Sequence, residues 1–307
     1  MDLIESCEYE TIEIPLIAHE IIMQTTKSPE REQILRWFEL DKGIYHVGCT
    51  AKRLTFHSQQ QRAFNLIWSL KEEFGLADKR VAIVGTGLAG LTAAAAAHLL
   101  KAKVELFEKK ADNLPLQRGN ATRFVHPNIY SWPKPGSVYP VTHLPYFNWY
   151  DAEAGEIARK VLEQWNEISE EIPQKYLKTI TKVSSKNGKV FLDFEDGSSE
   201  PPYDFTLIAA GFGLEKALSE TSTPSYWRND SLDQPVLEKK PVLTYCVCGA
   251  GDGALLDTIR LKIKDFQHRQ LVDWMLRNPW FFSQAEHISD ALSNGKSIHD
   301  VWLEFGC

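Results

Sequence analysis

The sequence predicts an α/β protein built on a parallel β-sheet that carries a β-meander, with helical extensions at both ends of the chain. Three observations predict this class. A short apolar run, Val81–Val84, leads directly into a glycine-rich turn and an alanine-rich segment. Apolar and polar residues alternate over residues 180–194, and a second apolar run, Phe205–Ala210, also ends in glycine. Continuous apolar runs are typical of parallel strands buried on both faces, whereas alternation is typical of antiparallel strands.

The turn after the first strand carries the pattern G-x-G-x-x-G. Its first glycine permits a tight turn, the second leaves room for a pyrophosphate against the backbone, and the third lets the next helix pack closely. The N–H groups and dipole of that helix then favour a phosphate. A turn that serves tight packing alone is the alternative interpretation. The predicted dinucleotide-binding residues are Gly85, Thr86, Gly87, Leu88, Ala89 and Gly90.

The segment after the glycine turn completes a Rossmann-type unit. Leu91–Leu100 is rich in alanine and is predicted to be helical, and Val104–Phe107 is predicted to be the second strand. Glu108 stands at the end of this strand, where a carboxylate accepts hydrogen bonds from ribose hydroxyls and repels a 2′-phosphate. FAD or NAD therefore fits the site better than NADP. Lys109, the next residue, is included in the predicted cofactor site.

Composition describes an ordinary globular chain. It has 307 residues, of which 43% are hydrophobic and 24% charged, and its net charge of −7 argues against a nucleic-acid-binding surface. The N-terminus shows no pattern of a signal peptide, and the longest apolar stretch is too short to span a bilayer. The five cysteines form no C-x-x-C pair. We therefore expect a reduced cytoplasmic protein with no metal site and no membrane contact.

Three regions are expected along the chain. Residues 1–78 are predicted to form a helical preface, with one helix over Pro29–Leu40 and another that Ser58 caps. Residues 79–260 are predicted to form the FAD/NAD(P)-binding domain, and 261–307 a helical C-terminal segment. The helix after Ser58 is predicted from apolar residues at helical spacing, namely Ala63, Phe64, Ile67, Leu70 and Phe74.

Residues 111–150 contain six prolines and many aromatic residues. The prolines exclude a long helix, and the aromatic content is too high for a disordered linker, so we expect an ordered loop lying on the nucleotide fold. Arg118 and Arg123 are predicted to reach cofactor phosphates. His126, Tyr130 and Trp132 are candidates to line a ring-binding or substrate pocket. The alternative is that these aromatic residues only pack the loop and that the arginines are solvated.

An amphipathic helix is predicted over residues 151–168, followed by a hairpin with Asn187-Gly188 at its turn and then the strand that ends in Ala209-Ala210-Gly211. This order of elements resembles the FAD domain of flavoprotein oxidoreductases of the glutathione-reductase and thioredoxin-reductase type. The elements are a strand, the glycine turn, a helix, a strand with a terminal acid, a second helix, the meander and a last strand. In that family an A-T-G segment closes the fold near the cofactor, and here alanine replaces the threonine.

The resemblance has specific implications for the cofactor. It implies that the three glycines hold the FAD pyrophosphate and that Glu108 binds the adenosine ribose. It further implies that the backbone near Val183 meets adenine, and that Ala210 and Gly211 lie near the cofactor. The resemblance covers residues 81–110 and 179–211 well and 111–150 hardly at all.

A second glycine motif stands at Gly249–Ala254, after a predicted strand at Val242–Cys248 and before a predicted helix. Two interpretations stay open. The motif resembles that of the NAD(P)H-binding half of two-dinucleotide flavoproteins, and its Gly251-Asp252 also resembles the Gly-Asp pair that binds the flavin ribitol. The short remaining chain favours the second, since a whole nucleotide domain needs several more strands. A glycine loop of S-adenosylmethionine-dependent methyltransferases is a weaker resemblance, because such folds usually begin with that loop.

The favoured function is that of an FAD-dependent oxidoreductase, which transfers electrons between a small-molecule substrate or NAD(P)H and an acceptor through a non-covalent flavin. No catalytic acid or base stands out in the sequence. The alternative is a non-catalytic FAD- or NAD-binding sensor or assembly subunit with an incomplete second nucleotide domain. A homo-oligomer, or a partner chain that completes that domain, is also expected.

Overall fold

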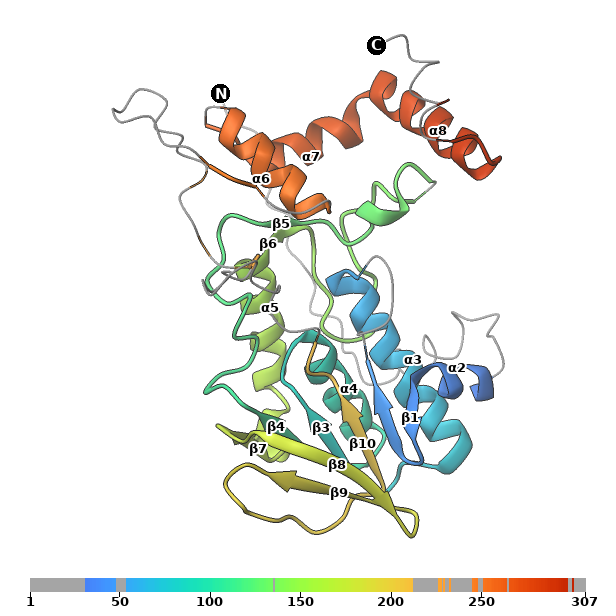
Figure 1. Ribbon diagram of the computed structural model, residues 1–307, viewed down its shortest axis with the longest axis vertical. Helices are drawn as coiled ribbons and strands as arrows, with labels where there is room; N and C mark the ends of the chain where they lie inside the picture. The colour runs from blue at the N-terminus through green and yellow to red at the C-terminus, as the bar shows by residue number, and fades with distance from the viewer. Residues whose placement is uncertain are drawn as a thin grey trace, which may run out of the picture.

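The computed structural model describes residues 31–47, 54–134, 136–211, 226–227, 229, 232, 245–247, 251–263, 265–297 and 300. Within this part, a mainly parallel sheet lies between helices on one face and a two-stranded hairpin on the other (Figure 1). The α/β class and the parallel sheet predicted from the sequence are therefore confirmed.

The central sheet has six strands in the order β1-β2-β10-β3-β4-β7. Strands β2, β10, β3, β4 and β7 run parallel to one another, and β1 pairs antiparallel with β2. All five parallel strands thus end at the same edge. The strand bounds are β1 Glu39–Asp41, β2 Ile44–His46, β3 Arg80–Val84, β4 Lys103–Glu108, β7 Gln174–Tyr176 and β10 Phe205–Ile208.

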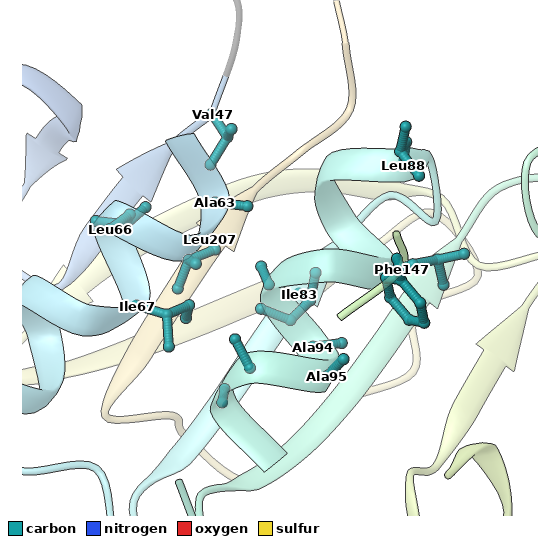
Figure 2. Packing of buried hydrophobic residues seen from close by; sticks show 14 of the residues in the cluster. Val47, Ala63, Leu66, Ile67, Ile83, Leu88, Ala94, Ala95, Phe147 and Leu207 are labelled. Atoms are coloured by element: carbon teal, nitrogen blue, oxygen red, sulfur yellow. The ribbon is translucent and has the colours of Figure 1, made fainter. Parts of the chain in front are cut away.

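The helical face holds the larger core cluster, to which four helices contribute. These are α2 (Arg31–Phe38), α3 (Phe56–Phe74), α4 (Leu88–Leu99) and α5 (Ala154–Asn166). Residues 93–97 of α4 are all alanines and are at most 6% exposed, and their small side chains let α3 and the sheet approach closely. Figure 2 shows this packing of α3 and α4 against β3 and β10 through Ala63, Leu66, Ile67, Ala94, Ala95, Ile83 and Leu207.

The predicted hairpin is formed by β8 (Ile180–Lys186) and β9 (Lys189–Phe194), which pair antiparallel. Asn187 and Gly188 both have positive φ, 52° and 71°, as a tight two-residue hairpin turn requires. Apolar side chains of β9 pack against the face of the sheet opposite to α4. The hairpin part of the predicted meander is therefore confirmed, and within the described residues its sheet has two strands.

Two further groups of elements follow the Rossmann unit. The proline-rich loop, residues 111–150, carries β5 (Phe124–Val125) and the 3-10 turn η1 (Ile129–Ser131). Strand β6 (Ala152–Glu153) follows the loop, and a second 3-10 turn, η2 (Ser169–Glu171), follows α5. Helices α6 (Asp252–Lys262), α7 (His268–Arg277) and α8 (Pro279–Ser293) lie at the opposite end of the molecule from the hairpin β8–β9 (Figure 1). In the described ranges, no helix is long and apolar enough to cross a membrane.

The N-terminal preface is not wholly helical. Helices α2 and α3 are present, but Glu39–His46 forms strands β1 and β2, and β2 pairs in parallel with β10. Strands of three residues are too short to give a periodic signal, so pattern alone did not identify them. Thr55 is the N-cap of α3, while Ser58, the predicted cap, supplies the reciprocal half of a capping box.

The strand predicted before the second glycine motif is wrong for its described part. Residues 245–247 belong to no strand and are exposed, with Tyr245 at 46% and Val247 at 39% of full exposure. An apolar run can be read as a buried strand or as a segment that packs elsewhere, and periodicity does not separate these cases. The rest of the predicted strand, and Gly249 and Ala250, lie outside the described residues.

A charge network joins strands β3, β4 and β7 to the segment that precedes β10. Glu105 in β4 has a side chain that is 16% exposed, and it accepts hydrogen bonds from Lys175 Nζ at 2.8 Å and Tyr203 Oη at 3.0 Å, as well as from Arg80. Burial alone raises the pKa of Glu105, but hydrogen bonds from these three partners outweigh it and lower the pKa. The ionised carboxylate therefore stabilises the fold.

Glu105→Gln is expected to lower the free energy of unfolding at neutral pH by about 2–3 kcal/mol, because three donors lose a charged acceptor. Because the pKa of Glu105 is lower in the folded than in the unfolded protein, its carboxylate stabilises the fold at any pH above the unfolded-state pKa. This stabilisation is lost as the pH falls through the folded-state pKa. Urea denaturation should therefore show the gap to the parent closing below about pH 4. Glu163→Gln, which breaks an exposed pair with Arg159, is the control, with an expected loss under about 0.5 kcal/mol. A pH-independent gap would contradict this account.

Candidate cofactor site

The glycine turn lies where β3 and β10 end side by side. Their register pairs Val84 with Ile208, and Ala209 N donates to Val84 O at 2.8 Å. Gly85 has φ +100°, and a Cβ there would stand 2.6 Å from Ala209 O. This position therefore requires glycine for both conformation and space. Ligands of open α/β sheets bind at such a carboxyl edge.

The other two glycines differ in what the fold demands of them. A Cβ on Gly90 would lie 1.9 Å from Gly85 O, so the closeness of α4 to the turn depends on glycine. Gly87 has an ordinary φ of −67°, and no atom of the described residues lies within 4 Å of its Cβ position. The fold of the described chain does not itself need glycine at residue 87. An open Cβ position of this kind fits a backbone that a pyrophosphate approaches closely.

Helix α4 presents backbone donors to this space. Gly87 is its N-cap, and the helical hydrogen bonds begin with Leu91 N to Gly87 O at 3.0 Å. The N–H groups of Leu88, Ala89 and Gly90 precede that bond and have no acceptor within the helix. Among the described residues, no side chain caps this helix. The donors and the positive end of the helix dipole thus fit a phosphate group.

Glu108 is held next to the turn. It is 7% exposed, and its Oε2 accepts from Thr86 N at 2.9 Å and Thr86 Oγ at 3.1 Å, while Oε1 accepts from Lys110 N at 2.8 Å. Lys109 and Lys110, which follow Glu108 in the chain, are exposed. A carboxylate held beside the N-terminus of α4 fits the role of accepting hydrogen bonds from the hydroxyls of an adenosine ribose.

The strand β10 brings the small-residue segment to the same place. Ala209 touches the Gly85 turn, and Ala210 and Gly211 follow it as exposed residues, Gly211 with φ +69°. The segment therefore lies beside the glycine turn. A contact between Ala210 or Gly211 and the cofactor itself stays a prediction.

Both candidate arginines have acidic partners. Arg118 is exposed and pairs with Asp112 at 2.9 Å. Arg123 is 3% exposed, pairs with Asp257 of α6 at 2.7 Å, and lies 4.1 Å over the ring of Tyr226. Arg123 therefore ties the loop to α6. Contact of either guanidinium with cofactor phosphates stays a prediction.

The remaining predicted contacts are scattered over the molecule. Val183 packs from β8 onto the cluster between the hairpin and the sheet. Gly251 is the N-cap of α6, and Asp252 begins that helix, with its side chain outside the described part. Their roles toward adenine and the ribitol stay predictions.

The proline-rich loop packs partly against the C-terminal helices and partly, through Phe147 and Trp149, on the core beside α3 and α5. Trp132 stacks on Phe281 of α8 with ring centroids 5.5 Å apart, and Phe282 meets it edge-on. His126 is 3% exposed, and burial lowers its pKa, whereas Tyr130 is 40% exposed. For Trp132 this geometry favours the packing interpretation over a pocket wall.

Sequence reasoning missed the contribution of the N-terminal segment to this edge. Val47, directly after β2, donates from its N–H to Ile208 O at 2.9 Å, which places the end of β2 beside that of β10. His57, in the first turn of α3, reaches Pro127 O of the proline-rich loop at 3.3 Å. The available signal was weak, namely the short segment Ile44–Val47, which contains His46 and is followed by Gly48.

The comparisons with known proteins agree with this architecture. Residues 79–255, more than half of the chain, match the family described as pyridine nucleotide-disulphide oxidoreductase. No curated protein matches the sequence.

Several solved structures are similar over part of their length. An NAD-dependent persulfide reductase from A. fulgidus is 17% identical, with 56% of this chain and 22% of that chain covered at a TM-score of 0.32. Lactococcus lactis thioredoxin reductase is 20% identical, with 44% and 36% covered at 0.30. This chain thus spans about a quarter to a third of these proteins, and at such TM-scores the family match alone carries the assignment. The chain belongs to the pyridine nucleotide-disulphide oxidoreductase family.

Proposed function

We propose that this chain binds FAD at the β3–α4 turn and serves in FAD-dependent oxidoreduction. The observation that carries the proposal is the difference among the three glycines. Gly85 and Gly90 are required by close backbone contacts, whereas the Cβ direction of Gly87 is open within the described chain. A turn that served packing alone would not need glycine at that position.

The residues at the sheet edge fit the parts of FAD that they would hold. The N–H groups at the start of α4 donate to the pyrophosphate, and Glu108 accepts from a hydroxyl of the adenosine ribose. The small side chains of Ala209 and Ala210 leave room for a flat ligand at the end of β10. Bound FAD supplies the electron chemistry of its ring, and the protein supplies orientation and a defined environment.

NAD(P)H is the proposed electron donor, and a small-molecule substrate or acceptor completes the proposed reaction. Residues 245–247 are exposed and form no strand, although a second Rossmann unit would need a buried strand before its glycine turn. This supports the interpretation that Gly251-Asp252 contacts FAD. We therefore propose that NAD(P)H binds against the flavin domain, or that a second copy or a partner chain supplies its site.

A non-catalytic sensor or assembly subunit is the second candidate. It is favoured by the described residues after Gly251, which form helices α6, α7 and α8 and no further parallel strand. Such a protein would bind the nucleotide and change shape or partner without turnover.

Anaerobic titration with NADH and NADPH separates the two candidates. The FAD-loaded protein is expected to lose its oxidised-flavin absorption on addition of one of these donors and to regain it when air or an artificial acceptor is admitted. If dithionite reduces the bound flavin but neither NADH nor NADPH does, the result would contradict the proposed donor and favour the sensor. Free FAD at the same concentration is the control for direct reduction.

A further inference from the structure

Thr86 donates two hydrogen bonds to the side chain of Glu108. It lies between the first two glycines of the turn and is 1% exposed. Its N–H and its hydroxyl both donate to Oε2 of Glu108, at 2.9 Å and 3.1 Å, and its carbonyl accepts from Leu114 N at 3.0 Å. The backbone bonds already fix the turn, so the hydroxyl is an additional constraint on the carboxylate.

The acceptor capacity of Glu108 shows what this constraint achieves. A carboxylate offers about four lone-pair sites. Thr86 takes two on Oε2, and the N–H of Lys110 takes one on Oε1 at 2.8 Å. The remaining acceptor site therefore lies on Oε1. A carboxylate whose other sites are occupied can turn only by breaking these bonds, so the direction of its free site is fixed before any ligand arrives.

We propose that the Thr86 hydroxyl is a positioning residue, which holds Glu108 so that Oε1 receives a hydroxyl of the adenosine ribose. This inference rests on the proposed function, because it requires FAD at the β3–α4 turn. Preorganised hydrogen-bonding groups strengthen binding by removing the cost of ordering them in the complex. Among side chains of similar size, serine keeps the hydroxyl at this position, whereas valine keeps the shape of threonine and removes it.

The test is a double-mutant cycle on the affinity for FAD, measured by quenching of flavin fluorescence. Thr86→Val is expected to weaken FAD binding about 10-fold, as is typical when a hydrogen bond to a charged group is lost. Thr86→Ser should stay within about 2-fold of the parent. Added to Glu108→Gln, Thr86→Val should cause no further loss, because the hydroxyl acts only through that carboxylate.

Thr92→Val is the matched control. Thr92 is also fully buried, in α4, and its hydroxyl donates to Leu88 O at 2.7 Å without touching Glu108. The Thr92→Val variant should bind FAD with the same affinity as the parent protein. Thermal unfolding of each variant shows whether it is folded at the assay temperature.

The possible failures can be told apart. Unchanged or tighter FAD binding by Thr86→Val would overturn the inference alone, and so would an equal loss on the Glu108→Gln background, which would indicate a general effect on the turn. A parent protein that binds no FAD would overturn the proposed function and this inference together.

Discussion

Gly87→Val is expected to weaken FAD binding by at least about 100-fold while the protein stays folded. The backbone at residue 87 has a φ that any residue adopts, and no described atom lies within 4 Å of the Cβ position. The Cβ atom of the valine would therefore meet no atom of the described protein within 4 Å. It would occupy the space next to the N-terminus of α4, where the pyrophosphate is proposed to bind.

Equilibrium dialysis with FAD measures this effect, and circular dichroism with thermal unfolding reports the fold. Gly188→Ala is a control at a glycine on the hairpin turn, far from the β3–α4 edge, and it should leave FAD binding unchanged. A folded Gly87→Val protein that retains a full complement of FAD would show that the pyrophosphate does not lie at this turn.

Gly90→Ala is expected to have the largest effect on stability, a loss of about 3 kcal/mol or more in the free energy of unfolding. The added methyl would stand 1.9 Å from Gly85 O, a backbone atom of a turn that is itself fixed by contact with Ala209. Relief requires α4 to move away from the sheet, and this disturbs the alanine-lined core.

Urea denaturation of the protein without added cofactor measures this loss, so that FAD binding does not contribute. Gly87→Ala is the matched control, because it adds the same methyl group to a glycine of the same turn that has open space around its Cβ position. Its free energy of unfolding is expected to change by less than about 1 kcal/mol. Equal stability of the two variants would contradict the tight contact between α4 and the turn.

The parts of the fold that the sequence predicted well are those with local causes. The glycine turn follows from the spacing of Gly85, Gly87 and Gly90, and the hairpin follows from alternation around Asn187-Gly188. Helix α5 follows from its apolar stripe. In each case the residues that specify the element are neighbours in the chain, so pattern and propensity suffice.

The parts that were missed depend on distant partners. Strand β2 has three residues and is specified by pairing with β10, more than 150 residues away in the chain. Arg123 pairs with Asp257, and no local pattern selects that partner over a phosphate. The exposed conformation of residues 245–247 likewise shows that an apolar run alone does not define a buried strand.

The candidate site shows the same division. The positions of the three glycines, Glu108 and the Ala209–Gly211 segment at one sheet edge could be predicted, because parallel strands end together. The double contact between Thr86 and Glu108 could not, since it depends on the rotamers of two side chains.

The central claim, that this chain binds FAD, is tested most directly by the visible absorption spectrum of the purified protein after incubation with FAD and removal of free ligand. The account predicts the bands of oxidised flavin and the release of FAD, identified by mass, on heating. A colourless protein that retains no FAD would contradict the account, and retention of NAD instead would assign the β3–α4 turn to a different dinucleotide.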